Sequence, residues 1–273
     1  QFVMKNLFVS LIFLCTTWLN FASGDSLQVN DDIDVNLFRA INSIESPVLE
    51  SVIKISDRSI IPGAIITPPL FYFAARSGNN YYDENSAVLL GVSNIFTGIT
   101  VLATKHIFKR DRPFQKIKNV NMRGKDPFLD KYSFPSGHTA FAFSTAGILS
   151  LRYSNEPILI AGLYSYAFLI GFGRVYLGVH YPSDVLGGMV LGSANALLTF
   201  GIRKGVIDAK NKIFNEENRP DINEQINVPG FALLGAFAGA EILNAVFQNS
   251  ESRLLKKTSF DFTGESIALR IKF

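Results

Sequence analysis

Six long stretches without a single charged residue occupy most of the middle of the chain. Each has between 16 and 20 residues, and a helix needs about 20 apolar residues to cross a bilayer, with a range of about 17–25. None of the stretches alternates apolar and polar positions as a half-buried strand does. The pattern predicts helices at 59–75, 86–104, 132–151, 157–173, 185–202 and 225–240, the last extending to about residue 248.

Several of these stretches are rich in Gly, Ala, Ser and Thr, the small residues that let helices approach closely inside a membrane. A soluble all-helical protein with long buried helices is the alternative. Six such helices in succession would then need an unusually large dry core. We therefore expect an all-α fold, a six-helix transmembrane bundle over residues 59–248.

Two different segments precede the expected bundle. Residues 1–24 combine a basic start, an apolar stretch from Leu7 to Leu19 and small residues at the end, which is the pattern of a secretory signal peptide. An uncleaved membrane anchor is the alternative. Residues 25–58 begin as a polar linker, and their apolar residues then recur at steps of three and four. This spacing predicts an amphipathic interfacial helix, or two helices broken near Pro47.

The C-terminal tail, residues 249–273, has a different pattern. Ile267, Leu269 and Ile271 alternate with more polar neighbours, and this period of two predicts a strand. A single strand must pair with another segment, and the sequence assigns the tail no function.

Composition excludes several classes of protein. Of the 273 residues, 48% are hydrophobic and 18% are charged, which excludes a disordered chain. The one cysteine, Cys15, lies in the N-terminal apolar stretch, so the rest of the chain forms neither a disulfide nor a thiolate zinc site. A net charge of +3 is too small to indicate a nucleic-acid partner. The positive charge is concentrated between Lys105 and Lys131, where nine Lys and Arg face three Asp.

Basic and histidine residues gather in three short segments at the ends of predicted helices. When the six predicted spans are counted along the chain, all three segments fall on the same side of the membrane. The segments are Lys105-x6-Arg112-Pro113, Pro135-Ser136-Gly137-His138 and Arg174-x5-His180-x3-Asp184.

These residue types suit a highly charged oxyanion. Lys105, Arg112 and Arg174 supply three cations, and the guanidinium fork matches phosphate oxygens bidentately. Ser136 is a good N-cap residue and Gly137 permits close backbone approach, so the N–H groups of this helix start can also hold an anion.

The third segment also supplies a nucleophile. His180 and Asp184 are four residues apart, and Pro182 favours a helix start between them. The carboxylate can then fix one imidazole tautomer and leave the other nitrogen free to attack. His138 lies on the same side and can protonate a leaving oxygen. This set of residues carries out the chemistry without a metal or a cofactor.

The three segments together resemble the signature of the type 2 phosphatidic acid phosphatase superfamily, Lys-x6-Arg-Pro, Pro-Ser-Gly-His and Ser-Arg-x5-His-x3-Asp. The one departure is Gly173, which stands where the signature has Ser. The resemblance implies the helical-bundle fold that these phosphatases share with vanadium haloperoxidases. It implies that His180 forms a phosphohistidine, that Asp184 activates it and that His138 protonates the leaving group. It further implies phosphoryl oxygens held, with no divalent metal, by Lys105, Arg112, Ser136, Gly137 and Arg174.

We therefore expect a membrane phosphatase that hydrolyses a lipid phosphate or pyrophosphate, such as undecaprenyl pyrophosphate, phosphatidylglycerol phosphate, phosphatidic acid or a lipid A phosphate. Its partners would be the membrane and this substrate. A cleaved signal peptide and the five cations of the loop 203–224 predict a bacterial inner-membrane protein with a periplasmic active site. The positive charge between Lys105 and Lys131 opposes that orientation under the positive-inside rule, but part of it is explained by phosphate binding.

Three other functions compete with this one. The first is a soluble secreted non-specific acid phosphatase of the same superfamily, which would not need the membrane. The second is a vanadium-dependent haloperoxidase, whose family holds vanadate with the same residues but is generally longer. The third is a catalytically silent membrane binding or transport protein. The intact Lys105, His138, His180 and Asp184 argue against the third.

Overall fold

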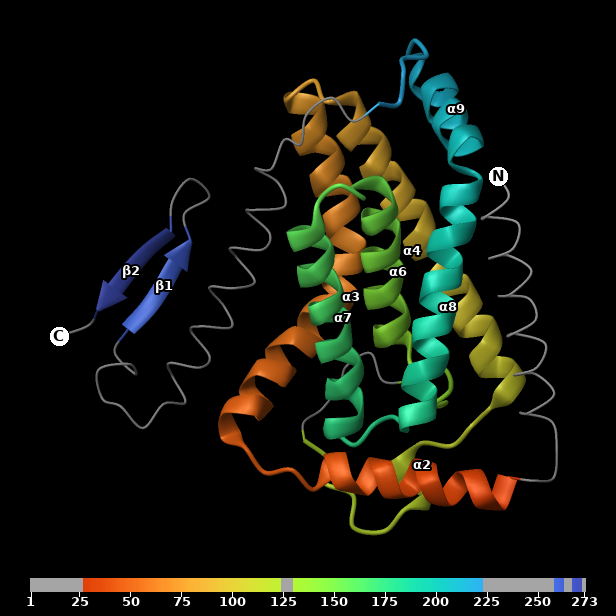
Figure 1. Cartoon of the computed structure of the whole chain (residues 1–273), viewed down its shortest axis with the longest axis vertical. Coiled ribbons are helices and arrows are strands. Elements are labelled where there is room, and N and C mark those ends of the chain that lie inside the picture. The colour runs from red at the N-terminus through yellow and green to blue at the C-terminus, as the bar shows by residue number, and fades with distance from the viewer. Residues whose placement is uncertain (1–26, 124–129, 223–257, 263–266, 272–273) are drawn as a thin grey trace.

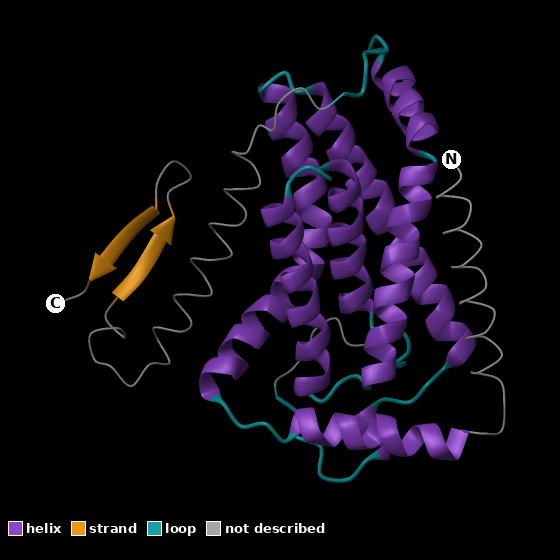
Figure 2. Ribbon diagram, viewed as in Figure 1, coloured by secondary structure: helices purple, strands orange, loops and turns teal. Residues whose placement is uncertain are grey.

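The computed structural model describes residues 27–123, 130–222, 258–262 and 267–271. Five long helices of the described chain stand side by side, and α2 lies across one end of them (Figure 1). Helices alone form this bundle, and the two strands pair with each other (Figure 2). The elements are α2 (Leu27–Asn42), α3 (Pro47–Ser77), α4 (Tyr81–Phe108), α5 (Pro113–Lys116), α6 (Gly137–Arg152), α7 (Pro157–Tyr176), α8 (Pro182–Gly201), α9 (Arg203–Phe214), β1 (Thr258–Phe262) and β2 (Ile267–Ile271).

The segment 25–58, predicted as one amphipathic helix or as two broken near Pro47, contains the helix α2 and the start of a second helix, α3. The break falls just before Pro47, which occupies the first position of α3, a place where a missing N–H costs nothing. Ser46 caps this start, its Oγ accepting a hydrogen bond from the Leu49 N–H at 3.3 Å. Residue 58, where the interfacial segment was expected to end, lies inside α3, so the helix continues from that segment into the bundle.

Helix α3 contains prolines in its interior and is stabilised by its neighbour α4. Pro68 has no N–H, so the carbonyl four residues earlier, that of Ala64, loses its helical partner. The side-chain amide of Asn94, buried on α4, donates to this carbonyl at 2.9 Å. A polar residue in an apolar helix thus satisfies a backbone group that would otherwise be costly to bury.

Helices α6 and α8 are in backbone contact. A Cβ atom on Gly192 of α8 would lie 2.1 Å from the carbonyl oxygen of Ala140 on α6, and one on Gly188 would lie 2.5 Å from that of Ser136. Only glycine permits this approach. The two helix starts are also joined directly, since the Ser136 N–H donates to the Asp184 carbonyl at 2.9 Å.

The outer face of the bundle is apolar. Large hydrophobic side chains are exposed along α4, where Ile95, Ile99 and Leu102 are each more than half exposed. Among the described residues, three helical segments are long and apolar enough to cross a membrane, Tyr81–Lys116, Pro157–Tyr176 and Pro182–Gly201. Helices of this length with exposed aliphatic side chains indicate a membrane protein.

The expected count of six spans is not confirmed. Four of the predicted stretches, 59–75, 86–104, 157–173 and 185–202, coincide with α3, α4, α7 and α8. The stretch 132–151 becomes helical only from Gly137, because Ser136 caps the helix there and residues 132–136 form a loop. The predicted helix at 225–240 and the predicted signal peptide at 1–24 lie outside the described residues.

The tail pairs with itself. Strand β2 coincides with the alternating positions that predict a strand, and its partner is β1, a few residues earlier. The two strands are antiparallel, with Thr258 opposite Ile271 and Phe262 opposite Ile267. This hairpin adds a small β element to the all-α fold that the sequence predicts.

The opposite end of the bundle from α2 is closed by charged pairs. Arg152, at the end of α6, forms a bidentate pair with Asp221 at 2.6 and 2.8 Å. Lys210 of α9 is buried and pairs with Glu216 at 2.9 Å. These contacts fix α9 and the chain after it against the bundle.

Candidate active site

The three signature segments meet at the end of the bundle that α2 covers (Figure 1). Each lies at a helix terminus, so alternating helix directions bring them together. Seven of the eight predicted residues are at most 6% exposed, and Gly137 is partly buried. The residues are Lys105 in the last turn of α4, Arg112 at the N-cap of α5, Ser136, Gly137 and His138 at the start of α6, Arg174 in the last turn of α7, His180 between α7 and α8, and Asp184 in the first turn of α8.

A tight turn after α7 positions His180. Its N–H and that of Val179 both donate to the carbonyl of Arg174, at 3.3 and 3.2 Å, so the chain folds back over the helix end. Gly178 makes this turn possible, because its φ is +84° and a Cβ atom there would lie 2.9 Å from the Asn121 carbonyl oxygen.

The two imidazole nitrogens of His180 face different partners. Nδ1 lies 3.5 Å from Oδ2 of Asp184, and Nε2 lies 3.3 Å from Nη1 of Arg112. Helix α8 begins at Pro182, so the predicted helix start between His180 and Asp184 is confirmed. A proton on Nδ1 then faces the carboxylate and leaves the Nε2 lone pair on the side of the cations.

His180 is neutral in this environment. Burial, and after it the positive charges of the neighbouring cations, holds the pKa of the imidazole well below its ordinary value of 6.5. The unprotonated ring is the nucleophilic form. The same cations that lower this pKa are the groups that an anionic substrate would meet.

Two of the predicted cations converge on one oxygen atom. Lys105 Nζ and Arg112 Nη2 both donate to Oδ1 of Asp130, at 3.1 and 2.8 Å. Arg112 is held from behind by the Val179 carbonyl, which accepts from Nη1 at 2.9 Å. The pair therefore already binds an anionic oxygen, here that of a half-exposed carboxylate on the following loop.

Arg174, the third predicted cation, is paired with a buried carboxylate. Arg174 Nη1 donates to both oxygens of Asp57, at 2.7 and 2.8 Å, and Asp57 reaches it from α3. This contact fixes one edge of the guanidinium. It also balances a charge that would be costly to bury alone.

The start of α6 has the predicted cap. Ser136 Oγ accepts from the Thr139 N–H at 3.4 Å and lies 2.9 Å from the Thr139 hydroxyl. His138 follows as the second residue of α6 and is 6% exposed. The Ser136 N–H is bonded to the Asp184 carbonyl. The first turn of α6, which carries His138, therefore lies beside the first turn of α8, which carries the Asp184 carboxylate.

Sequence reasoning missed four charged residues of this site. Arg110 is one of the nine basic residues between Lys105 and Lys131 and lies outside the signature, but its side chain is only 28% exposed and is bonded to Asp184. Its position two residues before the signature residue Arg112 could have indicated that it belongs to the site. Asp34, Asp57 and Asp130 carry no signal in the sequence, because their partners are distant along the chain. Among the described residues, no group of three or more His, Cys, Asp and Glu could hold a metal ion.

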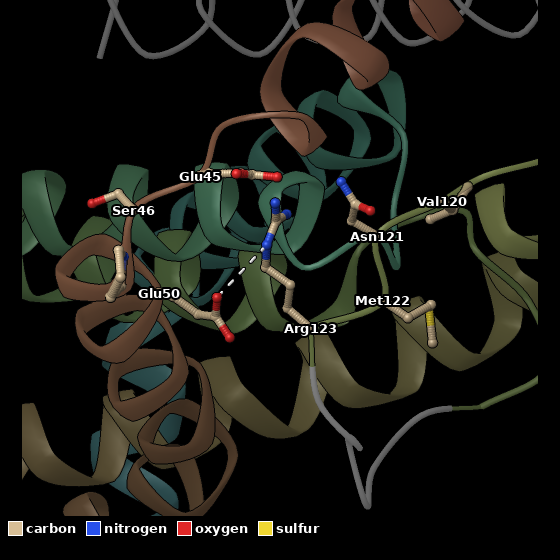
Figure 3. A pocket seen from close by; sticks show the side chains of 8 residues that line it. Glu45, Ser46, Glu50, Val120, Asn121, Met122 and Arg123 are labelled. Carbon is tan, nitrogen blue, oxygen red and sulfur yellow. Dashed lines mark ion pairs between the residues drawn. The ribbon is translucent and has the colours of Figure 1, made fainter.

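A polar pocket of about 670 Å³ lies between the α2–α3 connection and the segment 120–123 (Figure 3). Arg123 points across it toward Glu50, at 3.8 Å. The same guanidinium donates to the carbonyls of Tyr176 and Ile44 at 2.7 and 2.9 Å. The pocket is lined by Glu45, Ser46, Pro47, Glu50, Val120, Asn121, Met122 and Arg123, and by none of the eight signature residues.

Comparison with known proteins finds lipid phosphatases of one family. Residues 86–207 match the family model of the PAP2 superfamily. An undecaprenyl-diphosphatase of Sulfolobus acidocaldarius is 32% identical over 115 residues, 42% of this chain and 54% of that protein, so the match spans about half of that relative. Phosphatidylglycerophosphatase B of Bacillus subtilis is 27% identical over 209 residues, 67% of this chain and 98% of the relative. The crystal structure of a transmembrane PAP2-type phosphatidylglycerolphosphate phosphatase from B. subtilis shares the fold, with a TM-score of 0.54 and 23% identity over 72% of this chain and 96% of that one.

Proposed function

The chain belongs to the PAP2 superfamily, and we propose that it hydrolyses lipid phosphates or pyrophosphates through a phosphohistidine on His180. One observation supports this most directly. The buried ring of His180 has a carboxylate beside Nδ1 and the Arg112 guanidinium beside Nε2, so the Nε2 lone pair lies on the side of the cations that would hold a phosphoryl group.

The first step forms the phosphoenzyme. Nε2 attacks phosphorus in line, and the bond from phosphorus to the lipid oxygen breaks as the new N–P bond forms. The doubly negative phosphate favours the protonated form of the nearby His138 ring, and the leaving oxygen takes its proton from this imidazolium. Asp184 stabilises the positive charge that develops on the His180 ring. Lys105, Arg112, Arg174, the Ser136 hydroxyl and the Gly137 N–H stabilise the charge on the phosphoryl oxygens.

The second step returns the enzyme to its starting state. His138, now neutral, takes a proton from water as the water oxygen attacks phosphorus. The N–P bond breaks, inorganic phosphate leaves, and His180 is again neutral with its proton on Nδ1. Atoms and charges therefore balance over the two steps. Lys105, Arg112 and Arg174 act in both.

The substrate class follows from where the site lies. It is at one end of helices that are long enough to span a membrane, which in a bilayer would be the depth of the lipid headgroups. The two named relatives act on undecaprenyl diphosphate and phosphatidylglycerophosphate by their names, and phosphatidic acid and lipid A phosphates have the same chemistry. The exposed aliphatic side chains of the bundle and the transmembrane relative oppose the soluble secreted acid phosphatase.

A panel of substrates tests this assignment. Purified protein in mixed micelles is assayed for phosphate release from the four lipid classes and from glycerol phosphate, which has a phosphomonoester but no acyl chains. We expect kcat/KM for at least one lipid to exceed that for glycerol phosphate by more than about 100-fold. Equal values would favour the non-specific acid phosphatase.

We propose that the protein lies in the bacterial inner membrane with this site on the periplasmic side. The predicted signal peptide and the cations of the loop 203–224 support this orientation, although Lys210 among them is buried and paired with Glu216. Helix α2 would then lie in the outer interfacial layer, with Ile33 and Leu37, both at least half exposed, toward lipid.

Cysteine labelling in intact cells tests the orientation. Lys118→Cys lies at the active-site end and Ala209→Cys at the opposite end, both at exposed positions, in a background that carries Cys15→Ser. A membrane-impermeant maleimide should label position 118 and spare position 209. The reverse pattern would make the protein a phosphatase of cytoplasmic-leaflet lipids.

A further inference from the structure

Asp184 needs a cation, and the signature does not supply one. Its side chain is fully buried, and a buried carboxylate is stable only when it is paired and hydrogen-bonded. Oδ2 accepts from the Tyr181 N–H at 2.8 Å and faces His180. Oδ1 is bound by Arg110, whose Nη1 lies at 2.7 Å.

Arg110 is itself held on three sides. Its Nη1 also donates to the Ser183 hydroxyl at 2.6 Å, and its Nη2 donates to Oδ2 of Asp34 at 2.8 Å. The flat face of the guanidinium lies over the ring of Tyr181, 4.1 Å from its centroid. A planar fork fixed at both edges and on one face has a single orientation toward Asp184.

Asp34 brings helix α2 into this arrangement. Besides Arg110, it accepts from the Ser183 N–H, at 2.9 Å, and from the Ser183 hydroxyl. Ser183 is in the first turn of α8, next to Asp184, so Asp34 caps that turn from another helix. Helix α2 is anchored there by Phe38, which is 1% exposed and packs on Val185 and Val175.

We propose that Asp34 and Arg110 are positioning residues that hold the Asp184 carboxylate toward His180. Arg110 fixes Oδ1, which leaves Oδ2 facing Nδ1 of the imidazole, and Asp34 fixes Arg110. The proposal rests on the function proposed above, since it assigns α2 to the orientation of the nucleophile. The first helix of the described chain is then part of the catalytic unit rather than only a surface anchor.

The charges of the three groups explain why both residues are needed. Without Arg110, two carboxylates would lie close together with no cation between them, and Asp184 would turn or take up a proton. Without Asp34, the whole charge of Arg110 would fall on Asp184 and weaken its attraction for the positive ring of His180. In both cases the defect acts on His180 through Asp184, and the phosphate-binding cations are untouched.

The test uses the whole chain and four single variants, Asp34→Asn, Arg110→Lys and, as matched controls at exposed positions, Glu45→Gln and Arg39→Lys. We expect Asp34→Asn and Arg110→Lys to lower kcat by about 10- to 100-fold, the usual effect of removing a group that orients a catalytic residue. KM and the inhibition constant for vanadate should stay within about threefold. The controls should match the parent.

A double-variant experiment separates positioning from a merely structural role. In a background that already carries Asp184→Asn, adding Asp34→Asn should lower kcat by less than about twofold, because both changes act through the same carboxylate. A further 10-fold loss in that background would overturn the proposal, as would parent-like kcat in both single variants, or a loss that appears equally in vanadate binding. If Asp34→Asn does not fold, Arg110→Lys carries the same test.

The failure of this proposal can be told from the failure of the proposed function. If Asp184→Asn lowers kcat strongly and Asp34→Asn does not change it, only the positioning proposal fails. If Asp184→Asn is as active as the parent, the assigned chemistry itself is wrong.

Discussion

The close contact between α6 and α8 predicts that adding one methyl group will slow catalysis from a distance. Gly188 lies one helical turn after Asp184, and a Cβ atom there would be 2.5 Å from the Ser136 carbonyl oxygen. Real Cβ atoms stay beyond 3.0 Å from such atoms, and a backbone carbonyl cannot turn aside. In Gly188→Ala the two helices must therefore separate by at least about 0.5 Å.

This separation changes the geometry of the site, because α6 carries His138 and α8 carries Asp184. A misplacement of about 1 Å can cost about 100-fold in rate. We therefore expect kcat to fall about 10-fold in Gly188→Ala. Gly192→Ala needs nearly twice the separation, since its Cβ atom would lie 2.1 Å from the Ala140 carbonyl oxygen, and we expect about 100-fold. Each change should also destabilise the fold by about 1–3 kcal/mol through overpacking.

The assay is phosphate release by the purified variants, with thermal unfolding measured in the same detergent. Gly201→Ala is the matched control, because it is on the same helix and a Cβ atom there would meet no atom within 4 Å. It should keep the parent's kcat and melting temperature. If all three glycine variants behave like the parent, the α6–α8 spacing does not set the geometry of the site and the reasoning is refuted.

Three further outcomes follow from the site. Activity should survive excess EDTA and be inhibited by vanadate, because side chains supply the positive charge; complete loss in EDTA that magnesium or zinc restores would contradict this. Since burial, and then the nearby cations, lowers the pKa of His180, the acid limb of kcat/KM that reports its protonation should lie below pH 6.5, and a limb at or above that value would count against the nucleophile assignment. Asp130→Asn frees Lys105 and Arg112 from a half-exposed carboxylate, so the inhibition constant for vanadate should fall about two- to fivefold; a rise would show that Asp130 holds these cations in place instead.

The sequence predicts the helix starts beside the signature residues well, because local rules apply at helix ends. Ser136 is recognisable as an N-cap and Pro182 as a first-turn residue, and both start a helix in the structure. The same rules would have shortened the predicted helix at 132–151, because Pro135 and Ser136 mark its true start. Counting apolar residues alone does not detect that boundary.

Local rules of this kind do not predict the charged residues that support the site. Asp34 and Arg110 are 76 residues apart, and Asp57 and Arg174 are 117 apart. Each pair forms only when helices distant in the sequence are packed together. A single carboxylate on the polar side of an amphipathic helix is ordinarily solvated, so the sequence gives Asp34 no distinguishing mark. The fold alone shows that it faces the active site.

The central claim is tested most directly by trapping the phosphoenzyme. Protein mixed with a substrate labelled with ³²P in the scissile phosphate is quenched in base within the first turnovers, and the label on the chain is then followed in acid and in base. The account predicts an acid-labile, base-stable phosphohistidine in the parent and in His106→Gln, which changes the one histidine outside the signature. His180→Ala should form none and should turn over at background. Equal labelling or equal turnover in His180→Ala would contradict the account.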